Sequence, residues 1–158
     1  LSVNGETHTN SCEARTSLGD FLREELHLTG THFGCEHGAC GACTILFNGE
    51  PIRACLTLAA SAADQDVVTI EGLETDLITE ALRAAFKAEH ALQCGFCTPG
   101  MLITARDIVV RYAGSVMSDD EIRRELAGNL CRCTGYQGIV RAVRRVLSEK
   151  NIEKKNVD

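Results

Sequence analysis

The sequence contains no tryptophan, and aromatic residues make up only 4% of its 158 residues. A hydrophobic core must therefore be built from aliphatic side chains, and small domains with such cores often need additional stabilisation by a disulfide or a bound metal. Hydrophobic residues account for 44% and charged residues for 24% of the chain, which is ordinary for a globular protein. The length by itself allows one domain or two small ones.

Long apolar runs are also missing. No segment approaches the ~18 consecutive apolar residues that indicate a membrane-spanning helix. No signal-like apolar segment opens the sequence either, which disfavours export. We therefore expect no membrane span and a cytoplasmic location. A trimmed N-terminus would look the same, so this second expectation leaves a periplasmic location open.

Basic residues are too few to form the strongly positive face that a nucleic-acid partner requires. The net charge is −6. Residues 1–75 contain 3 Lys and Arg against 11 Asp and Glu, whereas residues 76–158 contain 13 against 11. The first part is thus near −8 and the second near +2. This asymmetry favours two domains with different surroundings and no nucleic-acid partner.

The first 74 residues carry the signals of a sheet with one helix. The pairs Asn4-Gly5 and Asn48-Gly49 are strong hairpin turns. Ser17 is a favourable helix N-cap, and the apolar residues that follow it share one helical face. The predicted strands cover residues 1–3, 6–12, 44–47, 51–54 and 67–70. We expect a mixed sheet with one helix packed on it.

From residue 76 onward the apolar residues recur at helical spacing. Thr98-Pro99 is typical of an N-cap followed by proline at the first helical position. Ser118 with Glu121 matches a capping box. Helices are predicted to begin near residues 77, 98, 118 and 137, and four helices with short links indicate a compact bundle. We therefore expect an α+β chain with domains at residues 1–74 and 75–158, and a frayed polar tail after Lys150.

Nine cysteines are the most unusual feature of the composition. In a secreted chain they would suggest disulfides, but the number is odd and no signal segment is visible. In a reducing compartment, clustered cysteines more often bind metal. Eight of them form two sets of four. The ninth, Cys12, stands at the end of a predicted strand, and we expect it to be a buried free cysteine rather than a functional thiol.

The first set consists of Cys35, Cys40, Cys43 and Cys55. Three of these follow a C-x4-C-x2-C pattern, which is the plant-type [2Fe–2S] spacing. The residues between them are mostly glycine and alanine, so the loop can wrap tightly around a cluster and direct backbone N–H groups at its sulfur atoms. The 48–49 turn would bring the fourth cysteine back to the others. The alternative is a zinc site, although zinc prefers two close C-x2-C-type pairs.

The second set consists of Cys94, Cys97, Cys131 and Cys133. It combines a C-x2-C pair with a distant C-x-C pair, and this spacing also suits zinc or, for the first pair, thiol–disulfide chemistry. Each pair precedes a predicted helix, so two helix N-termini would point at one site. Their positive dipole ends suit a cluster that becomes more negative on reduction. Spacing alone leaves a cluster and a zinc ion open.

Three segments resemble the small iron–sulfur subunit of the molybdenum hydroxylases, the family of xanthine dehydrogenase, aldehyde oxidoreductase and bacterial carbon monoxide dehydrogenases. These segments are GCEHGACGACT (34–44), QCGFCTPGM (93–101) and GNLCRCTGYQGIV (128–140). The resemblance continues in the family's order to about residue 148. It implies a plant-ferredoxin-like β-grasp domain followed by a four-helix-bundle-like domain, each with one [2Fe–2S] cluster. It therefore favours a cluster over zinc in the second set.

The resemblance also implies partners and a role. Its separate-subunit members pair with a large subunit that binds a molybdopterin dinucleotide and usually with a medium subunit that binds FAD, giving a heterotrimer or its dimer. Electrons would pass one at a time from molybdenum to the second cysteine set, then to the first set, then to FAD. Gln93 and Cys133 match positions that approach the pterin in the family. The chain itself would supply no acid, base or nucleophile.

Five further residues admit more than one interpretation. Four cysteines already complete the first set, so we expect His37 to be a loop residue and not a ligand. Arg132 could tune the cluster charge, contact the large subunit or form a structural ion pair. Arg141, Arg144 and Arg145 share one helical face, which we expect to be solvated rather than a docking patch.

Two rival functions belong to other classes. A stand-alone ferredoxin-like carrier would need only one cluster, so the second cysteine set argues against it. A zinc-stabilised interaction module would be colourless. The substrate of the complex is not revealed by this sequence.

Overall fold

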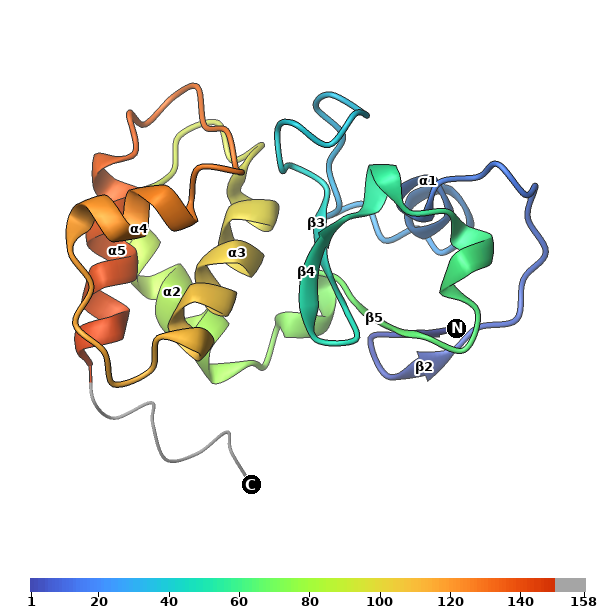
Figure 1. The fold of residues 1–158 in the computed structure, drawn as a ribbon, viewed down its shortest axis with the longest axis horizontal. Coiled ribbons are helices and arrows are strands. Elements are labelled where there is room, and N and C mark those ends of the chain that lie inside the picture. The colour runs from blue at the N-terminus through green and yellow to red at the C-terminus, as the bar shows by residue number, and fades with distance from the viewer. Residues whose placement is uncertain (150–158) are drawn as a thin grey trace.

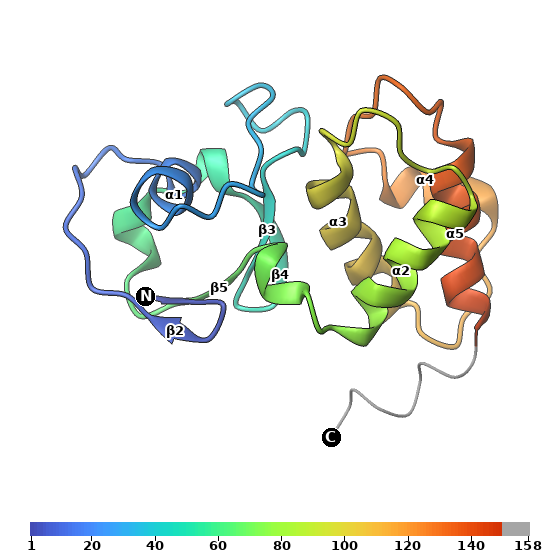
Figure 2. The same ribbon diagram turned by 180° about the vertical axis from the view of Figure 1, so that it is seen from behind.

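The structure is a computed structural model that describes residues 1–149. The tail predicted after Lys150 lies outside the described residues. Sheet and helices form two parts that lie side by side (Figure 1), and the view from behind shows the same division (Figure 2). The chain is therefore α+β, as predicted. None of the helices in residues 1–149 has both the length and the apolar character needed to cross a membrane.

The N-terminal part is a five-stranded mixed sheet with the order β2-β1-β5-β3-β4. Only β1 and β5 are parallel, and the other neighbours are antiparallel. The strands are β1 (Ser2–Val3), β2 (Glu6–Thr7), β3 (Thr44–Phe47), β4 (Glu50–Arg53) and β5 (Asp66–Val68). Both hairpins turn where predicted: Asn4, Gly5, Asn48 and Gly49 all have positive φ. Two-residue hairpin turns of type I′ require this conformation.

Two strand predictions were too long. The strand expected over residues 6–12 ends at Thr7, because β2 is an edge strand that pairs only with β1 and whose two residues are exposed. Cys12 therefore lies in an exposed loop, and the expectation that it is buried is wrong. The strand expected over residues 67–70 ends at Val68. There the backbone N–H of Thr69 donates to the side chain of Asn4 at 2.9 Å instead of continuing the ladder.

One short helical segment packs on the sheet. The hydroxyl of Ser17 accepts a hydrogen bond from the backbone of Asp20 at 3.0 Å, as predicted for an N-cap. The helix α1 (Leu18–Asp20) continues as the π-helical turn η1 (Phe21–Glu25). Short 3₁₀ turns are η2 (Ala54–Leu56), η3 (Ala59–Ala62) and η4 (Glu71–Leu73). The buried core between helix and sheet includes Val3, Leu18, Phe21, Leu22, Ile45 and Val67.

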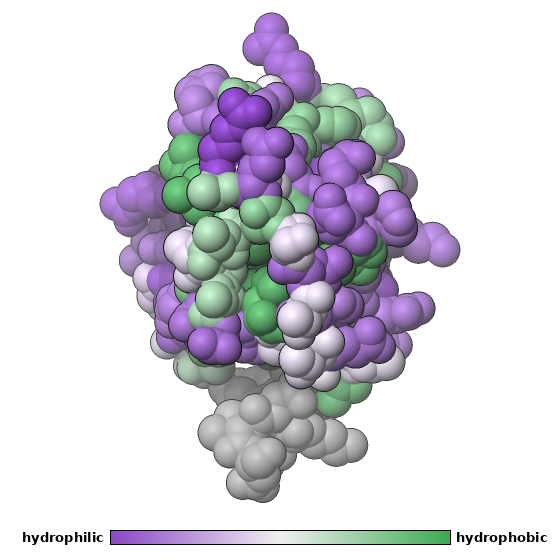
Figure 3. All heavy atoms as spheres, turned by 90° about the vertical axis from the view of Figure 1, so that its right-hand side faces the viewer, coloured by the Kyte–Doolittle hydropathy of each residue, from purple (hydrophilic) through white to green (hydrophobic). Residues whose placement is uncertain are grey.

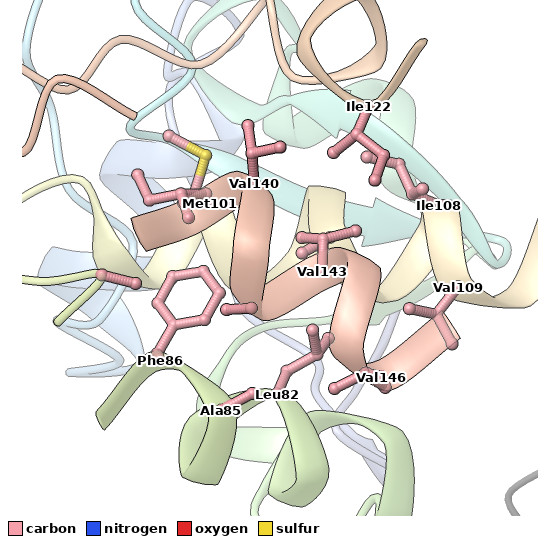
Figure 4. Packing of buried hydrophobic residues seen from close by; sticks show 14 of the residues in the cluster. Leu82, Ala85, Phe86, Met101, Ile108, Val109, Ile122, Val140, Val143 and Val146 are labelled. Carbon is pink, nitrogen blue, oxygen red and sulfur yellow. The ribbon is translucent and has the colours of Figure 1, made fainter. Parts of the chain in front are cut away.

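The C-terminal part contains the four predicted helices. They are α2 (Leu77–Ala88), α3 (Thr98–Arg111), α4 (Asp119–Glu125) and α5 (Gln137–Ser148). Side chains from all four converge on one aliphatic core, in which Phe86 is the only labelled aromatic residue (Figure 4). The capping box of Ser118 and Glu121 is present as predicted. The N-cap of α3 is Cys97 and not Thr98, because the carbonyl of Cys97 already accepts the first helical hydrogen bond, from Met101.

Helix α3 joins the two parts. Successive residues of a strand face opposite sides of the sheet. In β3, Ile45 accordingly packs in the core beneath α1, whereas Leu46 packs with Leu73 of η4 and with Ile103 of α3. The strand β3 is thus buried on both faces. At the far end of the sheet part, hydrophilic side chains are interspersed with small hydrophobic areas (Figure 3).

Candidate functional site

The first cysteine set lies where the loop before β3 meets the end of β4. Cys43 directly precedes β3, and Cys55 lies in η2 just after β4, so the antiparallel pairing of Thr44 with Arg53 brings their thiols together. The loop closes on the remaining two. The backbone N–H of Cys40 donates to Sγ of Cys35 at 3.3 Å. The structure therefore brings the four predicted residues of this set into one place.

The thiols of this set differ in acidity. The pKa of Cys35 is lowered to about 6, first because the backbone N–H of His37 points at its sulfur and then because that of Cys40 does. The pKa of Cys43 is raised to about 11, first by burial and then by the neighbouring thiols of Cys55 and Cys40, which together outweigh a hydrogen bond from the backbone N–H of Cys55. A thiol must lose its proton to bind iron. The buried Cys43 would therefore need the positive charge of a bound metal centre to become a thiolate.

Glycine is required where this loop meets the helical part. Gly41 has a φ of +72°, and a Cβ at this position would lie 2.4 Å from the carbonyl oxygen of Gly128. No side chain fits such an approach, and the conformation itself is strained for other residues. His37 is exposed in the same loop, with its ring against the carbonyl of Cys35, as expected for a loop residue.

The second cysteine set is assembled from two loops of the helical part. Cys94 and Cys97 precede α3, and Cys131 and Cys133 precede α5. The sulfur atoms of Cys94 and Cys133 lie 3.4 Å apart, and the thiols of Cys97 and Cys131 contact each other. Gly138 at the start of α5 permits this assembly, because a Cβ there would lie 2.4 Å from the carbonyl oxygen of Glu89.

Burial and hydrogen bonding also separate the thiols of the second set. The pKa of Cys97 is raised to about 12, first by burial and then by the thiol of Cys131. Burial also raises the pKa of Cys131, but hydrogen bonds from the hydroxyl and backbone of Thr134 outweigh it and leave that pKa below its ordinary value. The pKa of Cys94 is lowered as well, first by the backbone N–H of Phe96. Hydrogen-bond donors that lower the thiol pKa thus already face the sulfur atoms of Cys94 and Cys131.

The two sets are connected through direct contacts. The backbone N–H of Leu130 donates to the carbonyl of Cys40 at 2.8 Å, so a member of the first set contacts the residue just before Cys131. On the outside, the rings of His32 and Phe96 stack with centroids 4.8 Å apart. The loops that carry both sets lie at the same edge of the molecule (Figures 1 and 2).

A buried asparagine reinforces this connection. Asn129 is 2% exposed. Its Nδ2 donates to the carbonyl of Gly41 at 3.0 Å and to Oγ1 of Thr44 at 3.3 Å. Its Oδ1 accepts from the hydroxyl of Thr104 at 2.9 Å and, more distantly, from Arg53. The sequence patterns gave no prediction for this residue. Its only local signal is a polar side chain two positions before a cysteine of the second set.

The residues expected to meet a partner lie at the surface. Gln93 and Cys133 are both exposed. Leu92, Phe96 and Leu130, which flank the second set along the chain, are between 44% and 56% exposed. The edge that carries the second set therefore combines exposed apolar side chains with two accessible thiols, those of Cys94 and Cys133.

The arginines take different positions. Arg132 is exposed, and within residues 1–149 it forms no ion pair. On the helical face of α5, the exposed arginines pair with acidic neighbours. These pairs join Arg141 to Glu89, Arg144 to Asp119, and Arg145 to Glu89 and Glu149.

The donor chemistry of both sets fits a [2Fe–2S] cluster. Such a cluster is held by four cysteine thiolates and contains two irons. Each set offers four thiols on loops that also direct backbone N–H groups at sulfur. In the part of the chain that the structure describes, no three Cys, His, Asp or Glu side chains are arranged to hold a single metal ion.

Two family models of known proteins match consecutive stretches of this chain. A family model described as a 2Fe-2S iron-sulfur cluster binding domain matches residues 1–68, and one described as a [2Fe-2S] binding domain matches residues 69–144. The caffeine dehydrogenase subunit gamma of Pseudomonas sp. (strain CBB1) is 50% identical over 159 residues, which cover 98% of this chain and 93% of that protein.

Two further relatives are similar over most of their length. The nicotine 6-hydroxylase small subunit of Paenarthrobacter nicotinovorans is 49% identical over 143 residues, covering 90% of this chain and 85% of that protein. The crystal structure of quinoline 2-oxidoreductase from Pseudomonas putida 86 contains a chain that is 48% identical and superposes with a TM-score of 0.85. This match covers 92% of the chain described here and 90% of that chain.

Proposed function

Because the chain belongs to the family of small iron–sulfur subunits of the molybdenum hydroxylases, with two [2Fe–2S] binding domains, we propose that it relays electrons within a multi-subunit oxidoreductase. The β-grasp ferredoxin-like part and the helical part would each carry one cluster. We propose a domain boundary between residues 74 and 75, just before Asp76 caps α2. The observation that carries the proposal is the gathering of eight cysteines into two sets of four thiols.

The proposed ligands are the two sets described above. Cys35, Cys40, Cys43 and Cys55 would hold the N-terminal cluster, and Cys94, Cys97, Cys131 and Cys133 would hold the C-terminal one. When bound, the clusters supply one-electron transfer, and the protein determines their distance, orientation and potential. The backbone of this chain directs N–H groups at the sulfur atoms, and the hydrogen bond from Leu130 to Cys40 holds the two loops together.

The family resemblance implies a direction of transfer, and the exposure of two residues near the second set supports it. Gln93 and Cys133 lie at the surface, where a pterin held by a large partner subunit could approach. We propose that electrons enter at the second set from this molybdopterin dinucleotide and pass to the first set. They would leave to FAD on a medium partner subunit, within a heterotrimer or its dimer. A cytoplasmic location for this complex remains our expectation.

We propose no catalytic residue on this chain. The relatives reported above are named for caffeine, nicotine and quinoline, which are all nitrogen heterocycles. A nitrogen heterocycle is therefore the substrate class that we propose for the complex. The large subunit would select it, because the residues of this chain described above serve the clusters and their surroundings.

The test is electron paramagnetic resonance of the dithionite-reduced protein, with iron and sulfide quantified per chain. We expect about four irons and two distinct rhombic signals, because each cluster contains two irons. Replacing Cys43 by alanine should remove one signal, and replacing Cys131 should remove the other. Cys12→Ala is the matched control and should keep both. Two irons and a single signal in the wild type would leave the second set as a zinc or dithiol site and would end the relay proposal.

A further inference from the structure

The loop between Cys131 and Tyr136 places a hydroxyl group against one sulfur of the second set. Oγ1 of Thr134 lies 3.1 Å from Sγ of Cys131. The same oxygen accepts a hydrogen bond from the backbone N–H of Tyr136 at 3.2 Å. Because that bond uses a lone pair of the oxygen, the single hydroxyl proton remains available for the sulfur.

The direction of this contact is decided by the state of the cysteine. A cysteine that binds iron is a thiolate and has no proton to give. Thr134 must then be the donor, and its bond to Cys131 is of the charge-assisted kind. The lowered pKa of Cys131, with the hydroxyl of Thr134 among its causes, agrees with this direction.

The turn holds this hydroxyl in place. Tyr136 has a φ of 67°, in the left-handed region. Its phenol oxygen accepts from the backbone N–H of Cys131 at 2.8 Å and donates to the carbonyl of Asn129 at 3.2 Å. Cys131 is therefore fixed through both its backbone and its sulfur. A donor positioned in this way acts on the cysteine without first having to be ordered.

Within residues 1–149, no such hydroxyl serves the first set. In the described part of the chain, the hydrogen bonds to its sulfur atoms come from backbone N–H groups, such as those of Cys40 and Ala42, and from neighbouring thiols of the set. The two sets thus differ in the donors that their sulfur atoms receive. Hydrogen bonds to the sulfur atoms are one of the factors that set the reduction potential of an iron–sulfur cluster.

We propose that Thr134 is a positioning residue whose hydroxyl raises the reduction potential of the second cluster through Cys131. This inference rests on the proposed function, since it requires a cluster at the second set. Reduction adds one electron and makes the thiolate sulfur more negative, so the hydrogen bond strengthens in the reduced state and favours it. The proton stays on Thr134, and no bond is broken. The effect would help the second cluster accept the electron first.

The experiment is a redox titration of the complex that contains the full chain, followed by electron paramagnetic resonance of both clusters. Thr134→Val removes the hydroxyl at nearly constant volume. At a fixed solution potential it should lower the ratio of reduced to oxidised second cluster roughly tenfold, a shift of about 59 mV for one electron. The first cluster should be unchanged. Thr134→Ser keeps the hydroxyl and should restore the wild-type potential.

Thr98→Val is the matched control. Thr98 follows Cys97 in the chain as Thr134 follows Cys133, but within residues 1–149 no hydrogen bond joins its hydroxyl to a sulfur atom. This variant should leave both potentials unchanged. An unchanged second potential in Thr134→Val, or equal shifts of both clusters, would overturn the inference. So would a serine variant that behaves like the valine variant.

Failure of the inference can be told apart from failure of the proposed function. A wild-type protein without a second cluster signal contradicts the proposed function. A wild type with both signals and an unaltered potential in Thr134→Val contradicts only the role of Thr134. If the valine variant does not assemble the second cluster, Thr134→Ala takes its place. Loss of the cluster in both, with assembly in the serine variant, would assign Thr134 to assembly and overturn its role in tuning.

Discussion

Replacing Asn129 by alanine would remove the side chain that connects the two cysteine-bearing parts. Three well-formed hydrogen bonds would be lost: those to the carbonyl of Gly41 and the hydroxyl of Thr44, and the one accepted from Thr104. The substitution leaves the backbone of the loop intact. It therefore measures how much this single buried side chain stabilises the association of the sheet with the helices.

The expected magnitude follows from which partners remain satisfied. The carbonyl of Gly41 keeps hydrogen bonds from the hydroxyl and backbone of Thr44. Removing its bond from Asn129 therefore costs close to the net value of one hydrogen bond, about 1 kcal/mol. The hydroxyl of Thr44 keeps its bond from Arg53, so removing its bond from Asn129 also costs about 1 kcal/mol. The buried hydroxyl of Thr104 loses its partner, which costs about 1–2 kcal/mol more. The free energy of unfolding should fall by about 3–4 kcal/mol in total.

The assay is thermal unfolding of the holo-protein, followed by circular dichroism at one fixed scan rate for all variants. A loss of this size corresponds to a fall in Tm of about 6–16 °C for a chain of this length. Thr104→Val should cost only about 1 kcal/mol, because Oδ1 of Asn129 keeps its bond from Arg53. The double variant should lose less than the sum of the two, because neither partner is then left unpaired.

The control for this series is Asn10→Ala, in an exposed loop where the structure describes no hydrogen bond of the side chain. It should leave the Tm unchanged. If Asn129→Ala unfolds within 2 °C of the control, where about 6 °C or more is expected, the reasoning fails. Additive losses in the double variant would also refute it, because they would mean that Asn129 and Thr104 do not act through a shared hydrogen bond.

The remaining predictions concern one charge and one glycine. Burial raises the pKa of Asp76, but the hydrogen bond from Arg106 helps to leave it below its ordinary value; Asp76→Asn should therefore cost up to about 1 kcal/mol at neutral pH. The loss in free energy of unfolding should be complete above the unfolded pKa of ~3.9 and should vanish as the pH falls through the lower folded-state pKa. Urea titrations at several pH values measure it, and a loss that grows on acidification would contradict the prediction. Gly41→Ala should abolish binding of the first cluster, because the new Cβ would meet the carbonyl of Gly128 at 2.4 Å. Gly49→Ala has a similar positive φ with open space around it, and iron analysis should find it fully loaded; equal iron in both variants would refute the explanation.

Local chemistry determined much of the fold. The turns at Asn4-Gly5 and Asn48-Gly49 and the caps at Ser17 and Ser118 were predicted correctly, because each depends on residues within about four positions of one another. The grouping of the cysteines was also visible in the sequence. Short spacings such as C-x2-C keep two thiols close in any compact loop.

The predictions were wrong for segments whose structure depends on neighbouring elements and not on local sequence. The segment after β2 is polar and has no neighbour in the sheet, so it does not extend to Cys12, and that thiol is exposed. Helix α3 begins at Thr98, one residue before the predicted first position, Pro99. The backbone N–H of Thr98 donates to the carbonyl of Gly95, and Cys97 between them already has helical dihedral angles.

What only the tertiary structure decided is how the two cysteine sets meet. Asn129 contacts Gly41 across 88 positions of sequence, and Leu130 reaches Cys40 across a similar separation. No short-range pattern encodes these pairs, because they form only when α3 packs against β3 and brings the two loops to one edge. The sequence by itself determined which eight cysteines we propose as cluster ligands. The packing of the helices on the sheet determined how closely the two sites approach, because that depends on the shapes of both buried faces together.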